Sequence, residues 1–168
     1  MSQRRSYRSF VSYMDRSREY YSAQGYAQAY AWAHHDEVPL TPLKKPLSQC
    51  RVGLVTTADR AKPAGDDEEA RRAMRHPYAE PTSPPPARLY TEDLAWDKKA
   101  THTEDVDSFL PLHRLAELAA AGRIGSVSPR FYGVPTAYSQ GQTISRFAPQ
   151  ILEWCREDGV DAVLLSAL

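Results

Sequence analysis

Thiols are scarce in this sequence. Its 168 residues include only two cysteines, Cys50 and Cys155. Small secreted domains that depend on disulfides carry more cysteines at closer spacing, so that class of protein is excluded. Cys50 stands at the edge of one predicted strand, and Cys155 lies on the apolar face of a predicted helix. We therefore expect both to be reduced core residues of a cytoplasmic protein.

Long apolar runs and an excess of charge are also lacking. No apolar stretch approaches the roughly 20 residues of a membrane span. The basic N-terminal segment MSQRRSYRSF lacks the apolar core of a secretory signal. Lys+Arg and Asp+Glu both number 21, whereas proteins that bind nucleic acid usually carry a basic excess. We expect neither a membrane nor a nucleic acid as a partner.

The glycine-rich loops that bind nucleotide phosphates are missing as well. The segment after the first predicted strand contains neither GxGxxG nor GxxxxGK followed by Ser or Thr. That segment is charged and contains proline, so it does not favour a flavodoxin-like mononucleotide binder.

What is present predicts an α/β domain over residues 49–168. We expect a mainly parallel sheet flanked by helices, as in Rossmann-like or flavodoxin-like folds. RVGLVTT at 51–57 is the first core strand, and AVLL at 162–165 has the short apolar run of a strand buried on both faces. IGSVSPRFYGVP at 124–135 predicts a short strand bent at Pro129, and 88–90 predicts another.

Apolar periodicity predicts two helices in this domain. The first begins at Pro111, and Gly122 closes it. The second begins near Thr143, and Gly159 stands where a helix end favours positive φ. Pro149 should kink this second helix or mark its true first turn. The face expected to be buried in the first helix comprises Leu112, Leu115, Leu118 and Ala119, and in the second Ile144, Phe147, Ala148, Ile151, Leu152 and Cys155.

Residues 1–48 are predicted to form a helical, tyrosine-rich arm followed by a proline-rich connector. Ser6 is the expected cap of the arm helix. The clustered aromatics suit either a stacking surface for nucleic acid or packing across the domain or into a second subunit. Zero net charge favours packing, so a homo-oligomer formed through residues 1–48 is the expectation.

Two groups of polar residues are candidates for a functional site. Thr56 and Thr57 end the first strand, where α/β proteins collect ligand contacts, and their hydroxyls suit a substrate carboxylate or a turn cap. Arg130 suits a carboxylate or phosphate, or an acidic neighbour. His102 and Asp105 are a candidate acid–base or metal-ligating pair, with a surface histidine as the alternative. Their spacing fits no known metal motif, so no metal is predicted, and the acidic run at 66–69 is expected to be solvated.

Three blocks of the sequence resemble one enzyme family. These blocks are VGLVTTA at 52–58, THTEDVDSFLPLHRLAELAAAGRIGSVSPRFYG at 101–133 and APQILEWCREDGVDAVLL at 148–165. They are similar to the selenoprotein B family, the catalytic components of glycine, sarcosine, betaine and D-proline reductases. The resemblance covers roughly residues 50–168, and its most specific part runs from Asp105 to Tyr132.

The resemblance implies a reductase of amino-acid-like substrates. In this family a selenocysteine follows the strand that corresponds to 162–165, and a cysteine comes soon after it. The selenolate is a strong nucleophile, for the reasons that govern thiolate reactivity. It attacks a substrate carbon activated by a pyruvoyl group, the C–N bond is cleaved reductively, and a thiol resolves the product as a selenosulfide. A dithiol or a thioredoxin-like protein supplies the electrons.

Several expectations follow from the resemblance. Since the codon UGA encodes selenocysteine and also stop, we expect the chain to be an N-terminal portion cut at a UGA, with its catalytic residue just after Leu168. The nucleotide triplet after Leu168 decides this. Neither cysteine precedes a serine, so a pyruvoyl group would come from a partner subunit. A non-catalytic α/β binding or assembly module is the alternative function.

The 168-residue chain is predicted to have no reductase activity, because the reactive selenolate lies outside it. The measurement is product formation from glycine, sarcosine, betaine and D-proline with a dithiol donor. Turnover of any of these substrates by this chain would refute the prediction.

Overall fold

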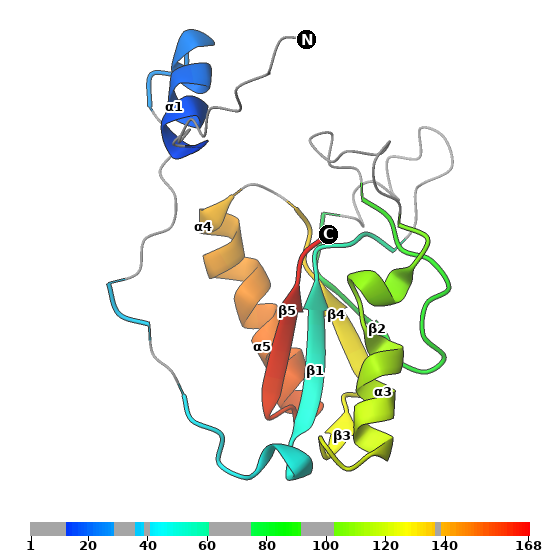
Figure 1. Cartoon of the computed structure of the whole chain (residues 1–168). Coiled ribbons are helices and arrows are strands. Elements are labelled where there is room, and N and C mark those ends of the chain that lie inside the picture. The colour runs from blue at the N-terminus through cyan, green and yellow to red at the C-terminus, as the bar shows by residue number, and fades with distance from the viewer. Residues whose placement is uncertain (1–12, 29–35, 39–40, 61–74, 92–102, 137–138) are drawn as a thin grey trace, which may run out of the picture. The chain divides into compact units, whose positions relative to one another are not determined.

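The computed structural model describes residues 13–28, 36–38, 41–60, 75–91, 103–136 and 139–168. The chain forms two compact units, Met1–Pro39 and Leu40–Leu168 (Figure 1). Each unit is described by itself. None of the helices in the described part of the chain has the length and apolar character needed to cross a bilayer.

The first unit contains the helix α1, Tyr13–Ala23. Gly25 follows it with φ of 87°, a left-handed conformation that favours glycine. The rings of Tyr20 and Tyr26 each contact Tyr21 edge to face, with centroids 5.6 and 5.8 Å away. All three tyrosines are exposed. The predicted helix is therefore present, while its expected cap, Ser6, lies outside the described residues.

The second unit is built around the strand β1, Arg51–Thr56. It pairs in parallel with three strands: β3, Ser126–Val127; β4, Arg130–Gly133; and β5, Ala162–Ser166. The strand β2, Tyr78–Pro81, pairs antiparallel with β4 at the edge of the sheet. The sheet is thus mixed and mostly parallel, which confirms the predicted α/β class.

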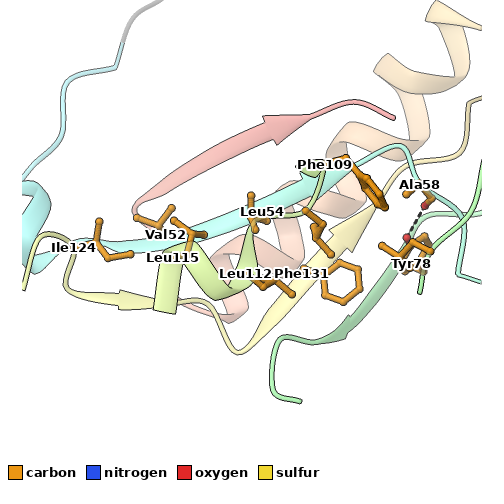
Figure 2. Packing of buried hydrophobic residues seen from close by; sticks show 11 residues of the cluster. Val52, Leu54, Ala58, Tyr78, Phe109, Leu112, Leu115, Ile124 and Phe131 are labelled. Carbon is orange, nitrogen blue, oxygen red and sulfur yellow. Dashed lines mark hydrogen bonds between the residues drawn. The ribbon is translucent and has the colours of Figure 1, made fainter. Parts of the chain in front are cut away.

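Alternation along β1 divides the core into two parts. Val52 and Leu54 pack toward the helix α3, Leu112–Ala120, whose Leu115 belongs to the same buried cluster (Figure 2). Val55 packs on the other face with the helix α5, Ala148–Glu157. The helices lie on opposite faces of the sheet, as Figure 1 also shows.

The bend predicted at Pro129 separates β3 from β4. Arg51 pairs with Ser126, whereas Val55 pairs with Tyr132, so the register shifts by two residues across the bend. A shift of two keeps every side chain on its own face of the sheet. The single bent strand of the prediction is therefore present as two short strands.

Helical turns connect these elements and lead into α5. The 3₁₀ helices are η1, Leu47–Gln49, and η2, Val106–Ser108. Ahead of α5 run α4, Gln140–Gln142, and the π-helical turn η3, Thr143–Phe147. Pro149 lies in the first turn of α5, directly after the π turn, because proline lacks the N–H of a regular helical hydrogen bond. Helical backbone also runs before α5 without a break from Gln140, so Pro149 stands inside a longer helix, beside its π-helical turn.

The buried face predicted for the last helix is only half correct. Phe147, Ile151 and Cys155 are buried, but Ile144 and Leu152 are exposed, as is Ala148. The buried residues are spaced four positions apart, so only one narrow row of side chains along the helix packs against the sheet. The neighbouring line, which carries Ala148 and Leu152, borders an open groove.

The prediction that the strand at 162–165 is buried on both faces was wrong. Val163, Leu164 and Leu165 of β5 are 42, 45 and 76% exposed. Among the described residues β5 pairs with β1 alone, so it is an edge strand. Its apolar composition indicated a strand correctly, but it could not show what covers that strand.

The prediction of a short strand at 88–90 was also wrong. Tyr90 forms only an isolated bridge with Asp59, and the additional strand is β2, Tyr78–Pro81, in a segment expected to be irregular. An edge strand tolerates proline at its end, because one side of it needs no ladder donor. The ring of Tyr78 lies against Gly133, its register partner on β4.

Replacing Gly133 with alanine should destabilise the second unit. A Cβ at this position would overlap the ring atoms of Tyr78, which is itself buried and donates a hydrogen bond to the Ala58 carbonyl at 2.6 Å (Figure 2). We expect Gly133→Ala to lower the free energy of unfolding by about 2 kcal/mol, as overpacking does. Urea denaturation measures it, with Gly141→Ala as the control because its Cβ would meet open space. Equal stability of both variants would contradict the packing described.

Candidate functional site

An apolar groove of about 640 Å³ runs between α5 and the strands β1 and β5. It ends at the carboxyl ends of these parallel strands, where Thr57 and Ser166 line it. Ligands of α/β proteins bind at this end of the sheet. The other lining residues are Val55, Thr56, Val134, Thr143, Ala148, Ile151, Leu152, Cys155, Arg156, Val160, Asp161, Ala162, Val163, Leu165 and Ala167.

Both predicted threonines lie at this mouth of the groove, but their hydroxyls already have partners. Thr56 is buried, and its Oγ1 accepts a hydrogen bond from the Ala58 N–H at 3.2 Å, so it caps the turn. Thr57 Oγ1 accepts from the Leu168 N–H at 2.9 Å and donates to the Leu168 carbonyl at 3.2 Å. Thr57 is only partly buried.

Arg130 lies away from the two threonines. It begins β4, whose last residue, Gly133, pairs with Thr56, so Arg130 is at the opposite end of the strand. Its Nε and Nη2 donate to both carboxylate oxygens of Asp158, at 2.8 and 2.9 Å, and Nη2 also reaches Glu157 at 2.9 Å. Of the two alternatives for this residue, the acidic neighbour is the one seen.

The Arg130–Asp158 pair is part of a larger network that ties α5 to the sheet. The Tyr132 hydroxyl donates to Asp158 at 2.7 Å, and Ser128 Oγ lies 3.1 Å from that hydroxyl. Because the tyrosine proton is used on Asp158, Ser128 must be the donor of the second bond. Arg51 also donates to the Asp158 carbonyl.

The network determines the charge states of its members. Burial by itself would raise the pKa of Asp158, but hydrogen bonds from Arg130 and Tyr132 outweigh it and lower this pKa below the usual value. Burial and the bond to Asp158 raise the pKa of Tyr132, so its hydroxyl stays protonated. This arrangement holds α5 in place and offers no free base.

The two cysteines do not form a redox centre. Both are free and buried, as predicted. Burial raises the pKa of the Cys155 thiol. A protonated, buried thiol is a poor nucleophile.

The predicted acid–base pair is only partly visible. His102 lies outside the described residues. Asp105 caps η2, and its carboxylate accepts from the Asp107 N–H at 3.2 Å. Asp107 is also 3.1 Å from Nδ1 of His113, which is exposed on α3. Nowhere in the described residues do three His, Cys, Asp or Glu side chains gather as a metal site would need.

Sequence reasoning missed the groove itself. Their apolar character predicts that Val163 and Leu165 lie in a closed core, whereas in the structure they line the groove. Arg156 also lines the groove, at the end near Val160, and pairs with no acidic side chain among the described residues. The alternation of β5 and the second line of apolar residues on α5 were the available signals. These patterns indicated one apolar face on β5 and one on α5. They did not show that an open groove separates the two faces.

Replacing Asp158 with asparagine should destabilise the protein in a pH-dependent way. The lowered pKa means that the carboxylate stabilises the fold above the unfolded value, roughly 3.9, and that this stabilisation is lost as pH falls through the folded pKa. We expect Asp158→Asn to cost about 2 kcal/mol at pH 7, as loss of hydrogen bonds to a charged group does. The two forms should converge once the pH has fallen below the lowered pKa of Asp158 in the folded state.

Urea unfolding of both forms across pH measures this difference. Glu153→Gln is the control, because Glu153 is exposed and, within the part of the chain that the structure describes, accepts only from Gln150. A difference that persists unchanged in acid would contradict the assignment.

Comparison with known proteins identifies the family of this chain. Searches of curated proteins and of solved structures each found no match. The family model of glycine/sarcosine/betaine reductase selenoprotein B matches residues 19–168. This match covers the whole described sheet, with its groove, and reaches into α1. The chain therefore belongs to the glycine/sarcosine/betaine reductase selenoprotein B family.

Proposed function

We propose that this chain forms the substrate-binding part of a selenoprotein B-type reductase component. The observation that carries the proposal is the position of the groove. It opens beside Ser166 and Ala167, so a residue that follows β5 in the chain would reach its mouth. Membership of the family supports a selenocysteine at that place. The reaction would be reductive cleavage of a C–N bond in a small amino-acid-like substrate.

The groove supports binding of the substrate's apolar portion. Its walls come from β1, β5 and α5, and most of the residues that line it are aliphatic. Of the three predicted carboxylate ligands, Thr56 is buried and caps a turn, and Arg130 is paired with Asp158 at the other end of β4. Thr57 is the best placed of the three, because it lines the mouth and is not fully buried.

Partners complete the proposed reaction. A pyruvoyl group would activate the substrate carbon, and a partner subunit would supply it. The two Cys-Arg dipeptides of this chain, at 50–51 and 155–156, lack the serine that forms such a group. A dithiol or thioredoxin-like protein would be the reductant. We further propose a cytoplasmic location and a homo-oligomer through residues 1–48.

A non-catalytic assembly module is the second candidate. The exposed apolar residues Val163, Leu164 and Leu165 on the edge strand β5 favour it, because exposed apolar edges commonly serve as contact surfaces. In this case the groove would hold part of another protein, and no substrate would be turned over. The two candidates therefore differ in the effect of blocking the groove.

Filling the groove should impair catalysis in the selenium-containing protein. Leu152 lines the groove and is 49% exposed, so Leu152→Trp should enter the groove without disturbing the core. We expect kcat/KM to fall about tenfold or more with a dithiol donor, by exclusion of substrate. Leu118→Trp is the control, because Leu118 is similarly exposed but lies on α3, across the sheet.

Two results would count against the reductase. Unchanged kcat/KM in Leu152→Trp would show that the groove is not the substrate site. Absence of turnover by the unmodified selenium-containing protein, with all four family substrates, would favour the assembly module.

A further inference from the structure

We infer that Thr57 is a positioning residue, which fixes the direction in which the chain leaves β5. This inference rests on the proposed function for its catalytic meaning. It departs from the prediction that Thr57 binds the substrate carboxylate. Its basis is a contact between residues 111 positions apart, at the mouth of the groove.

One hydroxyl satisfies both backbone groups of Leu168. Thr57 Oγ1 accepts from the Leu168 N–H at 2.9 Å and donates to its carbonyl at 3.2 Å. β5 has ended at Ser166, so no strand pairing holds this residue. The threonine hydroxyl takes the place of a ladder partner. It ties the segment after β5 to the loop after β1.

The loop that carries Thr57 is itself held in place. Thr56 Oγ1 accepts from the Ala58 N–H at 3.2 Å, and the Ala58 carbonyl accepts from the Tyr78 hydroxyl at 2.6 Å. Asp59 then exchanges two backbone hydrogen bonds with Tyr90, at 2.7 and 2.9 Å. Thr56, Ala58 and Asp59, which flank Thr57, are therefore each anchored by hydrogen bonds. A hydroxyl on such a support can orient another segment, because its own position is fixed.

The side chain of Leu168 gives a second point of attachment. It packs against the cluster on the α3 face, which includes Ala58 and Phe109. The segment after β5 thus crosses the end of β1 toward the α3 face, while Leu168 stays hydrogen-bonded to Thr57, which lines the mouth of the groove. With its backbone held by Thr57, the residue that follows would start at the mouth of the groove.

The hydroxyl can be removed with little change of shape. Thr57→Val retains the branched side chain but leaves both backbone groups of Leu168 without this partner. Thr57→Ser retains the hydroxyl. Thr82 offers a matched control, since its hydroxyl also donates to backbone carbonyls, of Ser128 at 2.7 Å and Pro129 at 3.1 Å.

Amide hydrogen exchange in the 168-residue chain tests the positioning directly. We expect the Leu168 amide to exchange about tenfold faster in Thr57→Val, as loss of one hydrogen bond implies. Thr57→Ser and Thr82→Val should leave this rate within about twofold of the parent. An unchanged rate in Thr57→Val would overturn the inference.

A measurement on the unsubstituted protein covers the case in which Thr57→Val does not fold. The Thr57 hydroxyl proton should exchange slowly and show a nuclear Overhauser effect to the Leu168 amide. Its absence would likewise overturn the inference.

Kinetics of the selenium-containing protein separate positioning from substrate binding. A positioning role predicts that Thr57→Val lowers kcat about tenfold with KM nearly unchanged, and that Thr57→Ser restores kcat. A raised KM at unchanged kcat would show contact with substrate and would overturn the positioning role. If the unsubstituted protein has no turnover, the proposed function fails, and hydrogen exchange still decides the role of Thr57.

Discussion

The parallel pairing of β1 with three other strands is the constraint on which the second unit depends. β1 is buried from Val52 to Thr56, and both core clusters contain its side chains. Its central place determines where β3, β4 and β5 end. Consequently, the carboxyl ends of β1, β4 and β5 meet at one edge of the sheet, where Thr56 pairs with both Gly133 and Ser166.

The two ends of β1 have different chemistry. At the amino end, charged groups hold the elements together: the Arg51 N–H donates to Asp161 at 2.8 Å, and Lys45 pairs with the same carboxylate at 2.8 Å. At the carboxyl end, the hydroxyls of Thr56 and Thr57 hold the backbone through hydrogen bonds instead, and the adjacent groove is mostly apolar. Charges therefore stabilise the end that is not proposed to react. The proposed reactive end keeps a largely aliphatic surface, on which an apolar portion of a substrate could lie.

Much of the fold could be predicted from sequence, because the decisive signals are local. The strand 51–56, the helix beginning after Pro111 and the positive φ of Gly159 each depend on neighbouring residues. The site could not be predicted in the same way. The bonds of Arg130 to Asp158 and of Thr57 to Leu168 join residues 28 and 111 positions apart, which no periodicity records. The continuous apolar run of β5 also predicted burial, but composition cannot show whether a neighbouring element exists to bury the strand.

The central claim is that the groove at the end of β5 serves a selenolate carried by the segment after this strand. Mass spectrometry of the native protein, with detection of selenium, tests it most directly. The proposed function predicts that the native protein contains one selenocysteine. A native product without selenium would contradict the account and favour an assembly module built on the same sheet.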